Sequence, residues 1–585
     1  MFLIVINFAI IHHITANEKM KVKLFIIGIA CLLLLVFFCM PIPVKKIPEG
    51  GPTIRVGLVE HLDKITISVD GAFQITDALG SRLAVNMNGG EWEVQITGGK
   101  ASRTIYRLLA LSTPELSKAE ELLEDLKFKG YPADVVTIGR KISETTHIPS
   151  ARRGIWFDSE NEYRSPGKEI ADNRVYHVYL QRAFSRKSDA DEYQKQLNRY
   201  VETTVRESYQ GDASGTIIMN SLSGGADYNF KETIKIVGSM VTIKDFSPKS
   251  NEKWDGTESR TYRGDMEFRI DDKGKLTVIN ELPVEVYLRG VVSSEMSVSF
   301  PLEALKAQAV AARSNVMRKI GIYHQEQHFD VCDDEHCQVY RGTVREAIPT
   351  DQAVAETHGT VLIYEDKICD APFFSTCGGH TENNDNVWSG EPVLHLRGVL
   401  DSEMRKDLLE GKFESEAFVW TWLNDAQNAK VYCNTLSEDI PIYLKTYAKY
   451  FRWELNYTQN ELAQLIRKKT GENVGELKNI IPLKRGVSGR IMKLKIEGTR
   501  KELILEKELN IRDALGEPRL YSSCFAVQRL GIVGDIPGEF VIKGAGYGHG
   551  VGMCQVGAAG MALAGKKYDD ILKHYYTGVE VTMIY

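Results

Sequence analysis

The stretch GVVSSEMSVSFPLEALKAQAVAARS, residues 290–314, decides how the second half of the chain is interpreted. Pro301 favours the first position of a helix, and the alanine-rich run after it predicts a helix that continues to residue 319. Lys306 and Arg313 are seven residues apart, so they project from one face of that helix. Glu295 comes just before the helix, and we expect it on a strand-to-helix turn near the positive end of the helix dipole.

Two interpretations of these three side chains remain open from spacing alone. A carboxylate on such a turn faces a cleft whose floor the helix forms, which suits a catalytic acid or base. An exposed glutamate near a helix start is more often a solvated side chain that matches the dipole, and the two basic residues also fit a polar helix face.

Length and charge set the limits for the whole chain. At 585 residues the chain is too long for one core, so we expect two to four structural units. Lys and Arg number 72 and Asp and Glu 78, so the net charge is 72 − 78 = −6. This charge gives no support for a nucleic-acid partner.

The amino-terminal region, residues 1–45, contains an apolar run, LFIIGIACLLLLVFFCMPI, at residues 24–42. These 19 residues carry no charge, which is enough to span a bilayer as a helix. A secretory signal has the same order of lysines followed by apolar residues. No small-x-small cleavage site follows, so an uncleaved membrane anchor is favoured, with Met1 or Met20 as the start. In either case we expect the bulk of the chain outside the cytoplasm.

A strand-like segment, residues 50–100, is followed by a pattern that occurs twice within residues 101–210. Each copy, starting at Tyr106 and at Tyr176, reads as a short strand, a polar turn and an amphipathic helix. The pattern resembles the sporulation-related repeat (SPOR) domain, which binds glycan strands stripped of their stem peptides. A generic ferredoxin-like pair of βα units fits equally well.

Cysteine and histidine cluster in HQEQHFDVCDDEHCQVYRG, residues 324–342. Cys332 and Cys337 are separated by four residues, and thiolates with imidazoles at short spacing suit zinc. His328 is the easier third ligand, because His336 is adjacent to Cys337 and both ligate only if the loop is irregular. A disulfide between the two cysteines is the main alternative outside the cytoplasm.

Two further loops are candidates for sugar binding. GAGYGHGVG, residues 544–552, frames Tyr547 and His549 with glycines that allow close approach to a ligand. STCGGHTENNDNVW, residues 375–388, offers amides followed by an aromatic ring. Ordinary structural loops have the same composition, so the two stretches do not establish a site by themselves.

Taken together, the chain resembles the stage II sporulation protein D / LytB (SpoIID domain) family. The matching stretches, in the family's order, are LPVEVYLRGVVSSEM, PLEALKAQAVAARS, DVCDDEHCQVYRG, CGGHTENNDNVW, FRWE, SGRIMKL, GAGYGHGVGMCQVGAAGMA and YDDILKHYYTGV. IRVGL at residue 54 resembles the usual start of this domain, which would make the repeats an insertion. The resemblance implies an α+β catalytic domain with a glycan-binding groove, here residues 215–585. The sequence departs from the family at Cys554, where many relatives carry serine.

The resemblance also implies an activity and a site. Family members are lytic transglycosylases that cut the MurNAc–GlcNAc bond of peptide-stripped peptidoglycan, or enhancers of the amidase that strips it. Glu295 matches the catalytic glutamate, and the chemistry needs one carboxylic acid, because the C6 hydroxyl of the sugar traps the reacting carbon. We expect Lys306 and Arg313 to bind the lactyl carboxylates of stripped muramic acid, and Tyr547 and His549 to contact the glycan.

The family pattern bears on the cofactor and partners as well. Some members bind zinc beside the active site through a histidine and a cysteine pair, which fits Cys332 and Cys337. The expected partners are peptidoglycan glycan strands, an N-acetylmuramoyl-L-alanine amidase and the membrane, with the bulk of the chain facing the cell wall.

Overall fold

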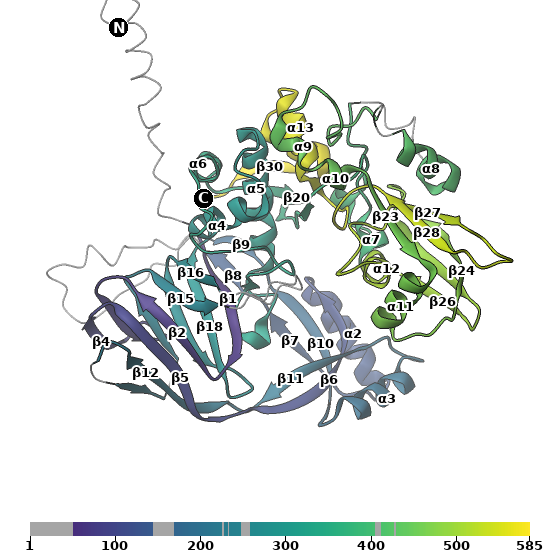
Figure 1. The fold of residues 1–585 in the computed structure, drawn as a ribbon. Coiled ribbons are helices and arrows are strands. Elements are labelled where there is room, and N and C mark those ends of the chain that lie inside the picture. The colour runs from purple at the N-terminus through teal and green to yellow at the C-terminus, as the bar shows by residue number, and fades with distance from the viewer. Residues whose placement is uncertain are drawn as a thin grey trace, which may run out of the picture. The chain divides into compact units, whose positions relative to one another are not determined.

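The computed structural model describes residues 51–143, 169–224, 227–231, 233–246, 258–403, 411–425, 427 and 429–585 (Figure 1). Strands and helices are mixed along these residues, which confirms the α+β prediction. The predicted anchor at residues 24–42 lies outside the described residues. Within the described ranges, no helix combines the length and the apolar character that a membrane crossing requires.

Two antiparallel sheets contain the strands from residues 51–100 and 214–283. One sheet has the order β19–β1–β18–β17–β14–β3–β4, and the other has the order β13–β12–β5–β2–β15–β16. The strands of the first are β1 (Thr53–Leu62), β3 (Phe73–Asp77), β4 (Arg82–Met87), β14 (Ile234–Val237), β17 (Asp265–Ile270), β18 (Leu276–Pro283) and β19 (Val331–Cys332). The strands of the second are β2 (Lys64–Val69), β5 (Gly90–Lys100), β12 (Ser214–Ser221), β13 (Tyr228–Phe230), β15 (Val241–Phe246) and β16 (Glu258–Tyr262).

This pairing corrects the predicted domain boundaries. β1 pairs along β18, from Thr53 opposite Pro283 to Leu62 opposite Leu276. Residues 50–100 therefore do not form a module of their own, because their strands complete the sheets of the following domain. A local hydrophobic pattern predicts a strand but not the distant strand with which it pairs.

The insertion predicted at residues 101–210 is a βαββαβ unit. Its sheet has the order β11–β6–β10–β7, and both helices contribute to a hydrophobic core separate from that of the neighbouring sheets (Figure 1). Its elements are β6 (Arg103–Thr113), α2 (Leu116–Phe128), β7 (Ala133–Ile138), β10 (Val175–Phe184), α3 (Lys187–Leu197) and β11 (Thr204–Gln210). β8 (Lys141–Ser143) and β9 (Glu169–Asp172) pair between its two halves. Lys100 of β5 lies opposite Ser214 of β12, so the chain leaves and re-enters the main domain at adjacent positions.

Two helices form the centre of the main domain, α4 (Val284–Glu295) and α5 (Leu302–Lys319). α5 is buried along most of its length, and its alanines allow close packing against α4 and four other elements. Those elements are α6 (Ile348–Glu356), β20 (Thr360–Tyr364), α13 (Gln555–Leu563) and α14 (Tyr568–Tyr575). The α5 helix is as predicted. The strand-to-helix turn predicted for Glu295 is wrong, because the residue is the last of α4.

A further core lies within residues 453–542 and is built from two three-stranded sheets with helices α11 and α12. Its elements are β23 (Trp453–Thr458), α11 (Gln459–Thr470), β24 (Leu477–Arg485), β25 (Ile491–Gly498), β26 (Glu502–Glu506), α12 (Glu508–Leu515), β27 (Phe525–Leu530) and β28 (Glu539–Gly544). The remaining elements are short: β21 (Lys367–Ile368), β22 (Phe373–Phe374), α7 (Asn384–Val387), α8 (Glu416–Asn424), α9 (Ile442–Lys445), α10 (Ala448–Phe451), β29 (Met553–Cys554) and β30 (Glu580–Met583).

Candidate active site and metal cluster

Glu295 ends helix α4 in a turn that its two serines reinforce. The hydroxyl of Ser293 donates to the carbonyl of Arg289 at 2.7 Å, and that of Ser294 donates to the carbonyl of Gly290 at 2.6 Å. These bonds occupy carbonyls of the last turn without interrupting the helix. At this end of a helix the dipole disfavours a negative charge, which is the opposite of what the sequence predicted.

A glycine brings the next segment onto this turn. A Cβ at Gly290 would lie 2.7 Å from the carbonyl oxygen of Gly342 and 2.7 Å from the ring of Tyr340, so the contact excludes any larger residue. The close approach places the backbone N–H of Val339 on Glu295 Oε1, at 2.8 Å. The motifs GVVSSEM and CQVYRG therefore meet at one carboxyl group.

The surroundings of Glu295 favour its protonated form. Burial raises the pKa of Glu295 to about 7, and the nearby Glu335 carboxylate acts in the same direction. The Val339 N–H and the charges of Lys319 and Arg341 oppose this shift of the pKa without cancelling it. A carboxyl group with a pKa near the working pH is suited to both give and take a proton.

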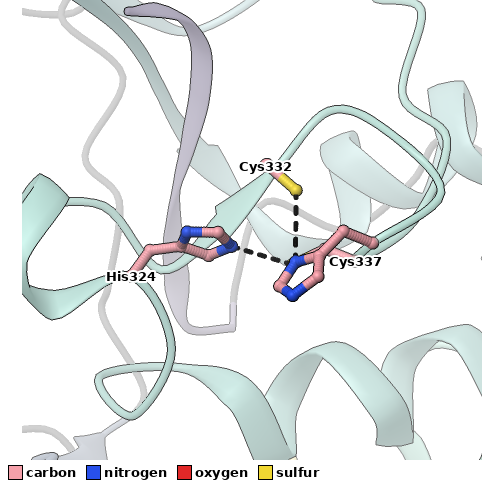
Figure 2. Close-up of side chains that lie close together, drawn as sticks. His324, Cys332 and Cys337 are labelled. Carbon is pink, nitrogen blue, oxygen red and sulfur yellow. Dashed lines mark hydrogen bonds between the residues drawn. The ribbon is translucent and has the colours of Figure 1, made fainter. Parts of the chain in front are cut away.

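Four side chains of the cysteine and histidine stretch converge: His324, Cys332, His336 and Cys337. His324 Nε2 lies 3.3 Å from Cys337 Sγ, and His336 Nδ1 lies 3.4 Å and 3.7 Å from the sulfurs of Cys337 and Cys332. Figure 2 shows three of these side chains close together. Ligands bound at about 2.0 Å through nitrogen and 2.3 Å through sulfur lie about 3.5 Å apart in a tetrahedron. The cluster therefore fits a tetrahedral ion such as zinc.

His328 is not part of this cluster, which corrects the predicted third ligand. Its Nε2 lies 3.5 Å from Asp272, and its carbonyl accepts hydrogen bonds from Arg55. His336 takes part instead, because the loop turns sharply there and the N–H of Cys337 donates to the carbonyl of Asp334. Cys332 and Cys337 are both free thiols in the structure.

The cluster adjoins Glu295 through the segment that follows Cys337. Lys319 Nζ donates to the carbonyl of Cys337 at 3.2 Å, and Gln338 donates to the carbonyl of Ala312 at 3.0 Å. The hydroxyl of Tyr287 donates to the amide oxygen of Gln338 at 3.1 Å. The segment is thus fixed between α4 and α5, and the sequence analysis identified none of Lys319, Gln338 or Tyr287.

Arg313 has no surface with which to bind a substrate. Its side chain is fully buried, and two of its nitrogens donate to the carboxylate of Glu285, each at 2.7 Å. A third bond reaches the carbonyl of Thr360 at 3.0 Å. Arg313 therefore stabilises the packing of α4 against α5, and the substrate-binding role predicted for it does not fit the structure.

Lys306 is also engaged within the fold. Its amine pairs with Glu303 at 2.9 Å and with Glu356 at 2.7 Å, and the lysine side chain is 14% exposed. A substrate carboxylate would have to compete with both partners. The predicted grip of Lys306 and Arg313 on a lactyl group is thus not supported by their surroundings.

The glycine-rich loop and the CGGH stretch are neighbours. Thr376 and Tyr547 bond to each other through both backbone N–H groups, at 2.8 Å and 3.1 Å. Gly546, Gly548, Gly550 and Gly552 all have positive φ, which side chains disfavour. The glycines are therefore required by the backbone path that joins the two motifs.

Both ring nitrogens of His549 are used inside this loop. Nε2 donates to the carbonyl of Phe373 at 3.1 Å, and Nδ1 accepts from the N–H of Val551 at 3.1 Å. Burial lowers the pKa of His549 to about 3, so the ring is neutral. The ring centre lies 5.1 Å from that of Trp388, which is 40% exposed. His549 therefore positions the loop, and Trp388 presents an aromatic surface to solvent.

Tyr547 lies in a group of aromatic rings. Its ring centre is 4.8 Å from that of Tyr450 and 5.5 Å from that of Tyr521, and its side chain remains partly exposed. The ring is thus rigidly placed while part of it stays open to contact.

A hollow on the surface beside Trp388 was not predicted from the sequence. The residues around it combine basic, acidic and aromatic groups: Arg318, Tyr364, Glu365, Lys367, Ile368, Cys369, Asp370, Asn384, Trp388, Val393, His395 and Leu396. Arg318 directly precedes Lys319, whose charge acts on Glu295. Arginine and lysine beside an exposed indole are suited to an anionic sugar.

Comparisons with known proteins agree with the motifs. A family model described as "Stage II sporulation protein" matches residues 272–364, and a model of a domain of unknown function matches residues 382–552. The chain is 31% identical over 318 residues to "Stage II sporulation protein D" of Bacillus amyloliquefaciens, covering 52% of this chain and 75% of that protein. It is 32% identical over 321 residues to an uncharacterized protein of Brachyspira hyodysenteriae, covering 55% and 72%. It is 26% identical over 547 residues to "Amidase enhancer" of Bacillus subtilis (strain 168), covering 89% and 68%.

Proposed function

This chain belongs to the stage II sporulation protein D family, and from that premise we propose that it is a peptidoglycan lytic transglycosylase. It cleaves the MurNAc–GlcNAc bond of peptide-stripped glycan strands and leaves 1,6-anhydro-MurNAc ends. The observation that carries the proposal is the partly buried carboxyl of Glu295, which accepts the Val339 N–H and whose pKa is raised to about 7.

The proposed reaction uses Glu295 twice. The protonated carboxyl donates its proton to the glycosidic oxygen as the bond from that oxygen to C1 breaks. The resulting carboxylate then takes the proton of the C6 hydroxyl while the C6 oxygen bonds to C1. No water is consumed, and the carboxyl ends as it began. The Val339 N–H occupies Oε1, so Oε2 is the oxygen that carries the proton.

We place the substrate's anionic group differently from the sequence-based prediction. Arg318 and Lys367 lie at the rim of the hollow beside Trp388, and neither is fully buried. We assign them to the lactyl carboxylate that is exposed once the peptide is removed. Trp388 and Tyr547 would supply apolar faces for the sugar rings.

Zinc is the proposed ion of the first cluster. His324, Cys332, His336 and Cys337 would bind it and leave no open position, which is typical of a structural site. Bound there, zinc would supply rigidity to the loop. The chain's own residues, Val339 and Gln338, then present the N–H to Glu295 and anchor the loop on α5.

The remaining roles follow from the same proposal. The βαββαβ unit would bind peptide-stripped strands as a SPOR-like module, and the described residues would lie outside the cytoplasm at the cell wall. An amidase that removes the stem peptides is the natural partner, because its product is the proposed substrate.

The test compares the wild-type chain with Glu295→Gln on amidase-stripped glycan strands. Mass spectrometry should find 1,6-anhydro-muramic ends only with the wild type, at least 100-fold above the variant. Glutamine is nearly the same size and still accepts the Val339 N–H, so binding to the strands should persist. Equal production of these ends by both proteins would exclude Glu295 as the acid.

A second candidate function is that of a non-enzymatic amidase enhancer. It is favoured by the "Amidase enhancer" relative, which aligns over 89% of this chain. Purified amidase with stripped and unstripped sacculi separates the two proposals, because an enhancer needs no acid. If Glu295→Gln stimulates the amidase as well as the wild type and neither protein forms anhydro ends, the enhancer function replaces the enzymatic one.

A further inference from the structure

A second group of metal-binding side chains lies apart from the histidine-containing cluster. One ligand atom from each of Cys377, Asp401, Cys433 and Cys554 lies within 4.8 Å of the other three. All four residues are buried, with exposed fractions from 0 to 2%. Three buried thiols and a buried carboxylate that face one another need an explanation, because an isolated buried charge is costly.

These residues come from four separate segments. Cys377 follows β22, and Cys554 is in β29, which pairs parallel to β22 with Phe374 opposite Cys554. Asp401 follows the bridge between His380 and Leu400, and Cys433 follows α8. The group therefore joins segments up to 177 positions apart, and it links the CGGH stretch to β29, which follows the glycine-rich loop.

Hydrogen-bond donors surround the ligand atoms. The N–H groups of Cys377 and Gly557 each donate to Cys554 Sγ at 3.2 Å, and the N–H of Gly379 donates to Cys377 Sγ at 3.3 Å. Donors of this kind favour thiolates, the form in which cysteine binds metals.

The carboxylate is supplied with donors in the same way. The N–H of Cys433 donates to Asp401 Oδ2 at 2.8 Å, and the hydroxyl of Tyr575 donates to Oδ1 at 2.6 Å. Such contacts orient a metal-binding carboxylate and fix which lone pairs remain for the ion.

No ion pair between a basic side chain and these four groups is seen among the described residues. Arg452 approaches, but its nitrogens donate to the carbonyls of Gly378, Phe451 and Trp422 at 2.9 to 3.3 Å. The sulfurs of Cys377 and Cys433 are 3.5 Å apart, well beyond the 2.05 Å of a disulfide and close to the spacing of two thiolates on one zinc ion.

We propose that Cys377, Asp401, Cys433 and Cys554 bind a second zinc ion as a closed structural site in the core behind the glycine-rich loop. Three thiolates select a soft tetrahedral ion, and the carboxylate completes the four positions. This site is independent of the proposed enzymatic function and of the His324 cluster.

The first measurement needs no substitution. The full-length chain is purified from zinc-supplemented cells, and its metal content and zinc X-ray absorption are recorded. We expect about two zinc ions per chain and an average of about two and a half sulfur ligands per ion, from one S₂N₂ and one S₃O site. About one ion with two sulfurs would overturn the proposal.

Variants then assign the ion to the group. In a Cys332→Ser/Cys337→Ser background, which removes the first cluster, about one zinc per chain should remain. Adding Cys433→Ser should remove it, whereas Cys369→Ser, a control at a buried thiol outside both clusters, should not. Loss of all zinc in the background alone, or a disulfide between Cys377 and Cys433 in the native chain by mass spectrometry, would overturn the site.

Discussion

Among single residues, Glu295 should affect the stability of the fold as well as its activity, because the pKa of its carboxyl is raised. A carboxyl whose pKa is near 4.5 in the unfolded chain and about 7 in the fold binds its proton more tightly when folded. The wild type therefore loses stability as pH rises from about 5 to above 7. Glu295→Gln cannot ionise, so it should be more stable than the wild type by up to about 3 kcal/mol at pH 8, and by almost nothing at pH 4.

Urea denaturation at pH 4, 6 and 8 measures this difference. Glu335→Gln is the matched control, since Glu335 acts on Glu295 only through its charge and should reproduce a small part of the effect. A stability difference between Glu295→Gln and the wild type that does not grow with pH would contradict the raised pKa. The cleavage activity should also fall as pH rises through about 7, because the protonated form of Glu295 is lost there.

The second prediction for single residues concerns how much the buried pair of Arg313 and Glu285 stabilises the fold. Arg313→Ala leaves the Glu285 carboxylate in the core without its guanidinium partner, while the hydroxyl of Tyr585, at 2.7 Å, and the N–H of Gly359 still donate to it. The free energy of unfolding should fall by about 3 to 5 kcal/mol.

The double variant Arg313→Met/Glu285→Leu should recover most of that loss, because no charge is left unpaired. Unfolding curves of the single and double variants test this. Arg313→Ala with wild-type stability, or a double variant as unstable as the single one, would show that the pair does not stabilise the core.

Residue-level prediction from the sequence failed where it depends on burial. The catalytic role that the motif assigns to Glu295 stays a prediction, whereas Cys332 and Cys337, marked by their spacing, lie together in the cysteine and histidine cluster. Spacing placed Lys306 and Arg313 on one helix face but could not show that Arg313 is fully buried or that Lys306 is paired with two glutamates. The choice of His328 over His336 assumed a regular loop, and the sharp turn at Asp334 removes that assumption.

At the scale of elements, the contact between α4 and the segment at 338–342 should control activity. Gly290→Ala adds a Cβ that would lie 2.7 Å from the Gly342 carbonyl and from the Tyr340 ring. The segment must move away by several tenths of an ångström, which lengthens the bond from the Val339 N–H to Glu295. We expect stability to fall by about 1 to 3 kcal/mol and cleavage by at least tenfold.

Ser294→Ala is the control, because it alters the same turn of α4 without adding volume and loses one hydrogen bond. It should retain most of the cleavage rate, measured as anhydro ends per minute on stripped strands. If Gly290→Ala and Ser294→Ala reduce the rate equally, the close contact is not what positions the carboxyl.

The two central helices show that a local sequence pattern predicts a helix or strand correctly only where tertiary packing does not override it. The helix after Pro301 was predicted because alanine, leucine and lysine favour helix throughout the run. α4 was missed, since VEVYLRGVV alternates and contains β-branched residues that favour a strand. Packing against α5 and α6 overrides that preference, because the helix buries Tyr287, Leu288, Val291 and Val292 in the same core.

At the scale of the whole molecule, the sequence predicted an inserted unit but not the sheets around it. The repeat of strand, turn and helix is local, so it could be recognised within residues 101–210. The pairing of β1 with β18 joins positions more than 200 residues apart, and no local pattern encodes it. The partners of β5 on both sides of the insertion are likewise visible only in the fold.

The insertion also touches the site, which complicates any deletion. Asn173, between β9 and β10, donates to the carbonyls of Met317 and Ile320 at 2.7 Å and 3.0 Å at the end of α5. Arg140, just before β8, pairs with Asp330 at 3.1 Å, two residues before Cys332. A deletion therefore removes both the proposed glycan-binding surface and two supports of the loop that carries Cys332.

The last prediction separates these two contributions. Joining Ser102 to Gly211 excises the βαββαβ unit where β5 and β12 already lie side by side, so the main domain should fold. The deletion variant should cleave short soluble stripped strands at a rate within about threefold of the wild type. Glu295 lies outside the unit, and its loop keeps its hydrogen bonds to α5 through Lys319 and Gln338 when the two supports are removed. Its retention on insoluble stripped sacculi should fall at least tenfold, because binding through two sites of one chain becomes binding through one site.

Asn173→Ala, which removes only a contact with α5, should bind sacculi like the wild type. Sedimentation with stripped and unstripped sacculi measures the binding. Undiminished binding by the deletion variant would show that the inserted unit does not grip the glycan, and loss of binding by Asn173→Ala would assign the effect to the contact with α5 instead.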